Sequence, residues 1–268
     1  MDPLIQTDIE QFIERGWCRV QGAFSKTQAA AARDVVWQRM RDKRGITRND
    51  PTTWPPACDV EENLDAPEIA ACFTDVLCEA IGQLVGPGRW CGVRRWGFWP
   101  VSFSFAHDAA QPYPDRGWHV DGNWFRHTLD CPKQGLLVIG LFSDIEPGSG
   151  GTVVAEGSHR RAARVLAAHP QGLAHQDLFN AVLAQPIGNF RELTGHAGDV
   201  VLAHPFLFHT RGCKRHGPPR FISNVEAPLR APMQLERADG HYSVLEGSII
   251  AALGSHEEVL IGPQLCSF

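Results

Sequence analysis

The chain has 268 residues, of which 43% are hydrophobic, which is enough to bury a sizeable core within a single domain. Its formal net charge of −5 and its isoelectric point near 6.2 argue against a surface that binds nucleic acid or anionic membranes, so we expect a small-molecule substrate. No apolar run reaches the roughly 20 residues of a membrane span, and the N-terminus lacks the basic and apolar regions of a signal peptide.

The eight cysteines contain no CxxC pair, which argues against a zinc ribbon and against a small disulfide scaffold. Reduced thiols and a cytoplasmic location are the simplest interpretation. The sequence therefore predicts a soluble protein without a nucleic acid or membrane partner.

Two helices are predicted near the N-terminus. Thr7 and Glu10 have the spacing of a capping box, and Ser25 and Gln28 repeat this spacing before an alanine-rich segment. The residues between the two helices, 17–20, predict a short strand.

The next part of the chain predicts a loop and then a long helix. Residues 45–60 contain Asn-Asp-Pro and Trp-Pro-Pro and are predicted as loop. The clearest helix begins at Pro67, keeps a 3.6-residue apolar rhythm and ends at the glycine-proline-glycine segment 86–88. Residues 1–88 thus form the helical part of the predicted domain.

Beyond residue 88, short β-type segments alternate with glycine- and proline-rich turns. These predicted strands lie at residues 101–106, 117–125, 135–145, 151–155, 199–204, 206–210 and 220–226. Many short strands are typical of a sandwich or a jelly roll. We expect a mainly β single domain with flanking helices, in which the jelly-roll core spans 89–230, a helical insertion lies at about 158–185, and 231–268 is a C-terminal extension.

A pattern of metal ligands lies in the predicted strand at 117–125, where His119 and Asp121 are two residues apart. Because alternate residues of a strand point to the same face, both side chains can bind one ion. A histidine and a carboxylate are two of the three ligands of the facial triad of non-haem Fe(II) enzymes, which leaves coordination positions open. The same pattern also occurs on ordinary polar strand faces, so a third ligand is needed.

A second segment supplies a candidate for that third ligand. Gly198-Asp199 opens an apolar strand, and His209 follows just before a glycine-bearing turn. Arg220 begins the next strand after the turn at 217–219, and we expect the two strands to bring His209 and Arg220 over one cavity. The planar guanidinium of arginine pairs bidentately with a carboxylate and stays charged at any working pH.

In this order, the segments resemble the phytanoyl-CoA dioxygenase family of 2-oxoglutarate-dependent oxygenases. The resemblance is carried by Trp118-His119-Val120-Asp121, by Gly150-Gly151-Thr152 with Gly157-Ser158-His159-Arg160, by Gly198-Asp199 with His209, and by Arg220 eleven residues later. It extends weakly to Phe12–Phe24 and covers the chain to about residue 227. Each motif is loose on its own, and their order and spacing carry the similarity.

The resemblance implies a double-stranded β-helix in which His119, Asp121 and His209 bind Fe(II). It implies 2-oxoglutarate as co-substrate, with Arg220 on its C5 carboxylate and Thr152 as a hydroxyl partner, although Thr152 can equally be an ordinary β-branched strand residue. The implied enzyme is a dioxygenase that uses O2 to oxidise a C–H bond of a small organic metabolite, with succinate and CO2 as co-products. Related halogenases carry a small residue in place of Asp121, so hydroxylation is favoured over chlorination, while desaturation, epoxidation and ring formation use the same triad.

The substrate side of the site is less clearly marked. Trp124 and Arg126 follow the metal motif and are candidates to hold an apolar substrate that carries an anion, although such residues also fill cores and extend to solvent. Some relatives bind the co-substrate with a glutamine three residues before the first histidine, where this chain has Arg116. The second contact to 2-oxoglutarate therefore stays open.

Other histidines and arginines are expected to be structural or solvated. His127 and His159 flank predicted loops, where either could contact substrate, although a surface position is favoured. Arg160, Arg161 and Arg164 are expected on one solvated helix face.

Two other functions remain as alternatives. A non-oxidative metal-dependent cupin, an isomerase or lyase that uses the metal as a Lewis acid, has the same fold but no need for Arg220. A non-catalytic binding protein has no need for the complete triad. The tail from about residue 230 to 268 either closes a homodimer or covers the active site.

Overall fold

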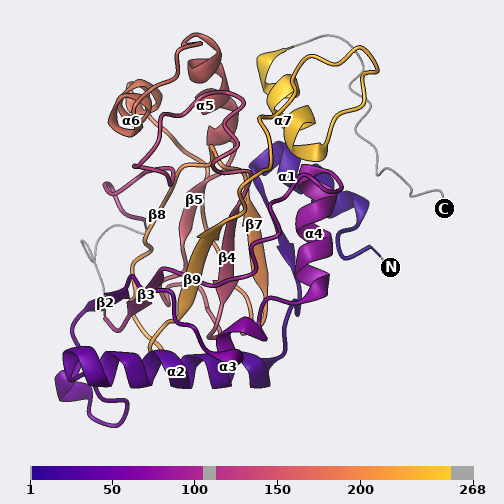
Figure 1. Ribbon diagram of the computed structural model, residues 1–268. Helices are drawn as coiled ribbons and strands as arrows, with labels where there is room; N and C mark the ends of the chain where they lie inside the picture. Colours follow the sequence, from indigo (N-terminus) through magenta and orange to yellow (C-terminus); the bar gives the residue numbers. More distant parts are fainter. Residues whose placement is uncertain (1, 105–112, 255–268) are drawn as a thin grey trace.

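The computed structural model describes residues 2–104 and 113–254, and Figure 1 shows helices arranged around a central group of strands. The helices are α1 (Gln6–Arg15), α2 (Lys26–Arg44), the 3-10 helix η1 (Pro51–Thr53), α3 (Pro67–Ala70), α4 (Asp75–Val85), α5 (Ser158–Ala167), α6 (His175–Leu183) and α7 (Val244–Leu253). The strands are β1 (Trp17–Val20), β2 (Ala57–Val60), β3 (Trp99–Ser102), β4 (Leu137–Leu141), β5 (Val153–Ala155), β6 (Phe190–Glu192), β7 (Val200–Ala203), β8 (His209–Thr210) and β9 (Ile222–Glu226). The predicted class, mainly β with flanking helices, is confirmed.

Of the two capping boxes predicted near the N-terminus, the structure contains one. The Ser25 hydroxyl accepts a hydrogen bond from Gln28 N at 3.1 Å, and the Gln28 side chain accepts one from Ser25 N at 2.8 Å, so the predicted box at the start of α2 is confirmed. Helix α1 begins one residue before Thr7, and the carboxylate of Asp8 accepts the hydrogen bond from Ile5 N at 3.0 Å. The predicted box at Thr7 is therefore wrong.

The long helix predicted from Pro67 is divided into α3 and α4. Thr74 causes the division, because its hydroxyl accepts a hydrogen bond from Leu77 N at 3.3 Å and donates one to Ala23 O at 2.6 Å. A threonine in this position starts a new helix. The predicted loop at 45–60 also differs, since it contains η1 and strand β2.

The larger sheet is antiparallel, with strand order β1-β7-β4-β9. Strand β3 continues it beyond β9, because Ser102 pairs with Arg220 and Phe98 pairs with Asn224 in one register. Pro100, midway between these pairs, has no N–H to donate, which explains why the ladder is interrupted there. Strand β2 then pairs with β3.

The smaller sheet has the order β6-β5-β8, and the segment around His119 lies along the free side of β8. Of the strand predicted at 117–125, only this bridge at His119 forms. The predicted strand at 101–106 begins earlier, at Trp99, and its last two residues lie outside the described part of the chain.

A compact apolar cluster joins the two sheets. It includes Ile139 of β4, Val201 of β7 and Ile222 of β9 from the larger sheet, and Val154 of β5 from the smaller one. Since side chains alternate along a strand, Asn224 and Glu226 point to the same inner face as Ile222. The outer face of the larger sheet is buried by helices in a second cluster.

Helix α2 is the longest of the described helices and runs along the lower side of Figure 1. Its Trp37 ring lies 5.3 Å from the ring of Phe221 and 5.8 Å from that of Phe103. No helix in residues 2–104 or 113–254 combines the length and hydropathy that crossing a membrane requires.

Helix α5 ties together the ends of three other helices through its arginines. Arg160 donates to Glu14 O in the last turn of α1 at 2.6 Å, Arg161 to Gln185 O just beyond α6 at 2.9 Å, and Arg164 to Ala252 O in the last turn of α7 at 2.8 Å. These carbonyls have no partner within their own helices. Arg164 is exposed and the other two arginines are half-buried, so solvent reaches this face, and the sequence does not reveal the acceptors that three helix ends supply to it.

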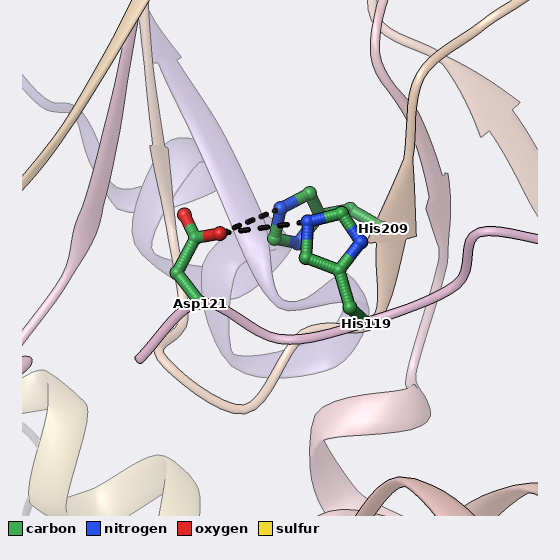
Figure 2. A group of neighbouring side chains, drawn as sticks. All are labelled: His119, Asp121 and His209. Carbon is green, nitrogen blue, oxygen red and sulfur yellow. Dashed lines mark ion pairs between the residues drawn. The ribbon is translucent and has the colours of Figure 1, made fainter. Parts of the chain in front are cut away.

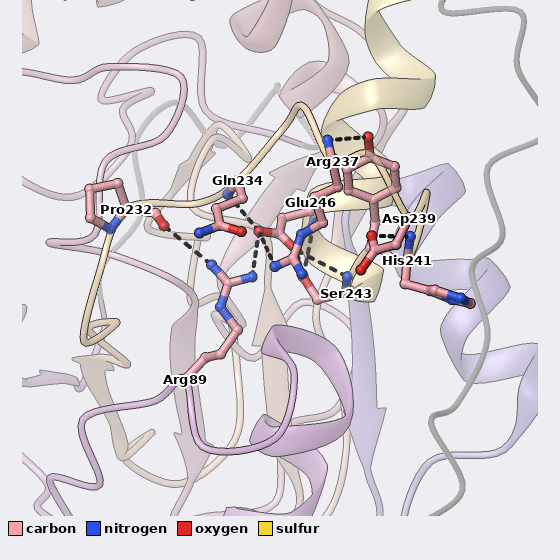
Figure 3. Close-up of polar contacts among 9 residues, drawn as sticks. Arg89, Pro232, Gln234, Arg237, Asp239, His241, Ser243 and Glu246 are labelled. Carbon is pink, nitrogen blue, oxygen red and sulfur yellow. Dashed lines mark hydrogen bonds and ion pairs between the residues drawn. The ribbon is translucent and has the colours of Figure 1, made fainter.

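The C-terminal extension is anchored by Glu246, whose side chain is fully buried (Figure 3). Its carboxylate forms ion pairs with Arg89 and Arg237 and accepts hydrogen bonds from Gln234 N at 2.7 Å and Ser243 N at 3.0 Å. Helix α7 also packs against α1, α4 and α5 of its own chain.

Candidate functional site

Two imidazoles are brought together by direct backbone pairing. His119 N donates to His209 O at 3.0 Å, and His209 N donates to His119 O at 2.9 Å. Residues that exchange both hydrogen bonds across antiparallel strands carry their side chains on the same face. The two ring centroids are accordingly 4.4 Å apart.

Asp121 completes a three-residue group (Figure 2). Its Oδ1 atom lies 3.5 Å from His119 Nε2 and 3.6 Å from His209 Nε2, and one ligand atom from each residue lies within 4.8 Å of the others. In residues 2–104 and 113–254, no other cluster of three histidine, cysteine or acidic side chains has this geometry. The sequence candidates for the metal ligands therefore meet at one point.

The tautomers of both histidines are fixed by backbone carbonyls. His119 Nδ1 lies 2.7 Å from Gly117 O, and His209 Nδ1 lies 3.1 Å from Leu207 O, so each Nδ1 carries the donated proton. Each Nε2 atom then faces Asp121, and offers a lone pair to a cation when the ring is neutral. His209 Nε2 is buried and has no hydrogen-bond partner, which is the state of an imidazole prepared to bind a cation.

The charges at this centre depend on one another. Burial alone would raise the pKa of Asp121, but the adjacent imidazoles of His209 and His119 hold it well below the ordinary value. Burial alone would lower the pKa of His209, but the Asp121 carboxylate raises it. A proton shared at this site thus occupies the place where a metal cation fits.

Two further histidines hold the backbone on either side of Asp121. His175 Nε2 lies 2.8 Å from Val120 O, and His127 Nε2 lies 3.0 Å from Gly122 O. His127 is only 2% exposed, and its burial lowers its pKa to about 4, so it is neutral at pH 7 and donates this N–H. The expected surface position of His127 is therefore wrong.

The surface position expected of His159 is also wrong. The ring is buried, and its Nε2 lies 3.1 Å from Ile13 O. Ile13 lies 146 residues away along the chain, so this contact could not be predicted from the residues around His159.

A cavity of about 460 Å³ opens beside the triad. Its walls are formed by Glu61, Phe98, His119, Val120, Asp121, Gly122, Asn123, Trp124, His175, Asn224 and Glu226. Trp124, a candidate substrate residue, is 65% exposed within it. Arg126 is not among the lining residues and donates to Gln171 O and Gly172 O, so its role in substrate binding stays a prediction.

Arg220 is placed on the inner face of the sheets, because it alternates with Ile222 and Asn224 along β9. It is 2% exposed, donates to Ser102 Oγ at 2.7 Å and leaves Nε without a partner. None of the ion pairs within the described residues includes Arg220. Burial, and then the charge of Arg211, lowers its pKa to about 9, so a charged guanidinium is buried at pH 7 without a carboxylate partner.

Thr152 is buried and directly precedes β5. It stands two residues before Val154, which pairs with His209, so its side chain is directed to the same face as His209. Arg116, where some relatives have glutamine, is exposed and offers its carbonyl to the Thr210 hydroxyl at 3.2 Å.

The acidic and amide residues of the cavity were not found from the sequence. Asn224 and Glu226 alternate with Arg220 along the predicted strand 220–226, and this pattern could have identified them. Glu61 follows strand β2, which was predicted as loop.

Comparison with known structures places the chain in a fold group. AviO1 from Streptomyces viridochromogenes Tue57 is 17% identical, with a TM-score of 0.55 over 87% of this chain and 99% of that chain. The epimerase SnoN, solved with Fe3+, alpha ketoglutarate and nogalamycin RO, is 14% identical, with a TM-score of 0.52 over 82% and 81%. EctD from S. alaskensis, solved with 2-oxoglutarate and 5-hydroxyectoine, is 16% identical, with a TM-score of 0.51 over 84% and 77%.

No family model matches the chain, and no curated protein matches it in sequence. At identities this low, structural similarity demonstrates the fold alone. The chain has the jelly-roll fold of these proteins, with the helices described above around it.

Proposed function

We propose that the chain is an Fe(II)- and 2-oxoglutarate-dependent dioxygenase that hydroxylates a C–H bond of a small organic metabolite, similar to the phytanoyl-CoA dioxygenase family. One observation carries the proposal: two histidines and one carboxylate converge on a point, in a fold whose inner face also buries an unpaired arginine. Two neutral imidazoles and a carboxylate are the donor set of non-haem Fe(II) oxygenases.

In this proposal His119, Asp121 and His209 hold the iron, and Arg220 holds the C5 carboxylate of 2-oxoglutarate, with Thr152 as a hydroxyl partner. When bound, iron and 2-oxoglutarate supply the activation of O2 that oxidises the substrate, with succinate and CO2 as co-products. The orphaned His209 Nε2 and the unpaired Arg220 Nε are the two observations on this chain that fit those groups.

The residues of the chain bind, orient and exclude water. His209, 5% exposed in its side chain, closes the inner side of the centre, while His119, 40% exposed, borders the cavity from which a substrate would approach. The carbonyls of Gly117 and Leu207 hold the two rings in one orientation. The negative charge of Asp121 would favour a bound cation, and the buried positive charge of Arg220 would favour a carboxylate.

Similar structures support the class of iron- and 2-oxoglutarate-dependent enzymes, and the type of reaction has to be found by experiment. SnoN is described as an epimerase and was solved with Fe3+ and alpha ketoglutarate, so one fold serves more than one outcome. Hydroxylation is our proposal because Asp121 keeps the carboxylate ligand. A Lewis-acid isomerase or lyase would not require the buried Arg220.

The test is an anaerobic titration followed by a turnover assay. The purified protein should develop the visible charge-transfer absorption that Fe(II) and 2-oxoglutarate produce together, and should release succinate in air with a panel of metabolites. His119→Ala and Asp121→Ala should lose both signals, whereas His169→Ala, at an exposed histidine beyond α5, should keep them. Protein that binds neither Fe(II) nor 2-oxoglutarate would refute the proposal, and turnover under nitrogen without 2-oxoglutarate would favour the non-oxidative alternative.

A further inference from the structure

The cavity beside the triad carries a charge pattern that iron and 2-oxoglutarate do not explain. Besides His119, Asp121 and His175, its polar and aromatic lining consists of two carboxylates, two aromatic rings and two amides, namely Glu61, Glu226, Phe98, Trp124, Asn123 and Asn224. Glu61 directly follows β2, Phe98 directly precedes β3, Asn224 and Glu226 lie in β9, and the remaining two belong to the loop that follows Asp121.

Strand register places three of these side chains in one row. Val60 pairs with Trp99, and the next residues along this antiparallel register, Glu61 and Phe98, continue it into the cavity. Phe98 in turn bridges to Asn224, whose N–H donates to Phe98 O at 2.9 Å. Laterally paired residues share a face, so a carboxylate, an aromatic ring and an amide stand side by side.

Glu226 extends the acidic surface along β9. It stands two residues after Asn224 and therefore points to the same face, toward the cavity that both residues line. Leu137 of β4 is its cross-strand partner and belongs to the inner apolar cluster. The carboxylate is thus presented at the edge of the apolar interior.

No lysine or arginine lines the cavity, although the charge of Arg95, which is not among the lining residues, acts on Glu226 and opposes the rise in its pKa that burial and Asp121 cause. The residues outside the described ranges, 1, 105–112 and 255–268, contain no lysine or arginine in their sequence either. The ion pairs of the described residues include neither Glu61 nor Glu226. An anionic substrate would meet repulsion here, whereas a cation would be attracted.

The aromatic side chains are placed to receive such a cation. Large hydrophobic residues with high exposure in the described chain are Ile5, Val76, Val93, Phe98, Trp124 and Leu253, and the two aromatic ones both line this cavity. Exposed aromatic faces beside carboxylates are the usual environment for ammonium groups, because the ring quadrupole attracts positive charge. Asn224 adds a buried Oδ1 that has no hydrogen-bond partner and would accept from an N–H donor.

We propose that this cavity selects an organic cation, so that the substrate carries a protonated or quaternary amine held between Glu61, Glu226 and the faces of Phe98 and Trp124. This inference rests on the proposed oxygenase function, because the cavity borders the metal centre. It replaces the anion-bearing substrate suggested by Arg126, whose guanidinium is directed to the carbonyls of Gln171 and Gly172.

The experiment compares probes of the same shape and different charge on protein loaded anaerobically with Ni(II) and 2-oxoglutarate. Phenethylamine, 2-phenylethanol and 3-phenylpropanoate are titrated by calorimetry, and choline is compared with 3,3-dimethylbutan-1-ol. Each cation should bind about fivefold or more tightly than its neutral counterpart, and the anion should bind most weakly.

Variants of the cavity residues test which side chains cause the preference for cationic probes. In the double variant Glu61→Gln/Glu226→Gln the preference for cations should disappear, and Trp124→Ala should weaken both cations by about fivefold. Glu79→Gln removes the same charge from an exposed position on α4 that lines no part of the cavity, and should leave the preference intact. Binding of Ni(II) and 2-oxoglutarate, measured in the same samples, should be unchanged in all these variants.

Equal affinity for the cation and its neutral counterpart, including no detectable binding of either, would overturn the inference, as would a preference that survives the double variant. If Ni(II) and 2-oxoglutarate still bind in that case, the proposed function stands and only the substrate class is wrong. If neither binds to the unaltered protein, the proposed function itself fails.

Discussion

Replacing Arg220 with methionine should stabilise the ligand-free protein and at the same time abolish stabilisation by 2-oxoglutarate. The side chain is 2% exposed, and within residues 2–104 and 113–254 its one hydrogen bond goes to Ser102 Oγ at 2.7 Å. A pKa lowered from 12.5 to about 9 corresponds to about 5 kcal/mol between the charged and neutral guanidinium in the folded chain. Below about pH 9 the group is charged in both the folded and the unfolded chain, so this whole penalty is present at pH 7.

Methionine fills a similar volume without a charge, but it leaves the Ser102 hydroxyl without its donor. We therefore expect the free energy of unfolding to rise by about 1–4 kcal/mol rather than by the full penalty. In the unaltered protein, 2-oxoglutarate at 100 times its Kd should add about 2.7 kcal/mol, because it supplies the missing carboxylate. Arg220→Met should lose that increment.

Urea denaturation at pH 7, with Ni(II) present and with or without 2-oxoglutarate, measures both effects. Arg230→Met, at an exposed arginine, serves as the control and should change stability by less than about 0.5 kcal/mol. Arg220→Lys keeps the charge without the planar fork and should bind 2-oxoglutarate weakly while remaining no more stable than the unaltered protein. A destabilised Arg220→Met variant, or one that 2-oxoglutarate stabilises normally, would refute the reasoning.

Three further changes test the centre and the C-terminal extension. His127→Phe keeps an aromatic ring but removes the N–H that holds Gly122 O at 3.0 Å, and should weaken Ni(II) binding in calorimetry by about 10- to 100-fold. Because Asp121 raises the pKa of His209 above 6.5, metal binding must displace a proton, and Fe(II) affinity should fall as pH drops through that raised value in titrations between pH 6 and 8. The raised pKa of His209 stabilises the metal-free protein fully below 6.5, and this contribution is lost as pH rises through the raised value. The lowered pKa of Asp121 contributes fully above the ordinary value of 3.8, and this contribution is lost as pH falls from there through the lowered pKa. Glu246→Gln weakens the fully buried anchor of α7 and should cost about 3 kcal/mol in urea denaturation.

Controls for these changes come from exposed positions of the same residue type. His169→Phe should leave Ni(II) affinity unchanged, and Glu236→Gln should leave the urea midpoint unchanged. Normal Ni(II) binding by His127→Phe, an Fe(II) affinity independent of pH, or an unaltered midpoint in Glu246→Gln would each contradict the corresponding argument.

The sequence could locate the candidate ligands because strand periodicity is a local property. His119 and Asp121 stand two residues apart, and their side chains share a face although only His119 pairs as a strand residue. The turn between His209 and Arg220 was a poorer guide, because β8 and β9 belong to different sheets and are not paired neighbours; the alternation of residues 119 and 121 was the useful local signal. Local patterns of this kind need no knowledge of distant residues.

Features that depend on distant partners could not be predicted. Thr74 ends one helix and starts another partly because its hydroxyl reaches Ala23 O, which lies 51 residues away. His127 is buried because Gly122 O and the returning Leu173 backbone surround it, whereas its sequence neighbourhood is polar and loop-like. Strand β2 was missed because its partner β3 lies far along the chain and its flanking prolines suggest a loop.

The arginines of α5 limit how this protein could be re-engineered. Loops and insertions around an active site are natural places to exchange sequence when a new substrate is wanted. Here, grafting a foreign segment over 158–185 would also remove the donors that serve Glu14 O and Ala252 O, on helices at opposite ends of the chain. A successful chimera would have to carry matching helix termini, or retain Arg160 and Arg164. The segment 158–185 therefore cannot be exchanged independently of α1 and α7.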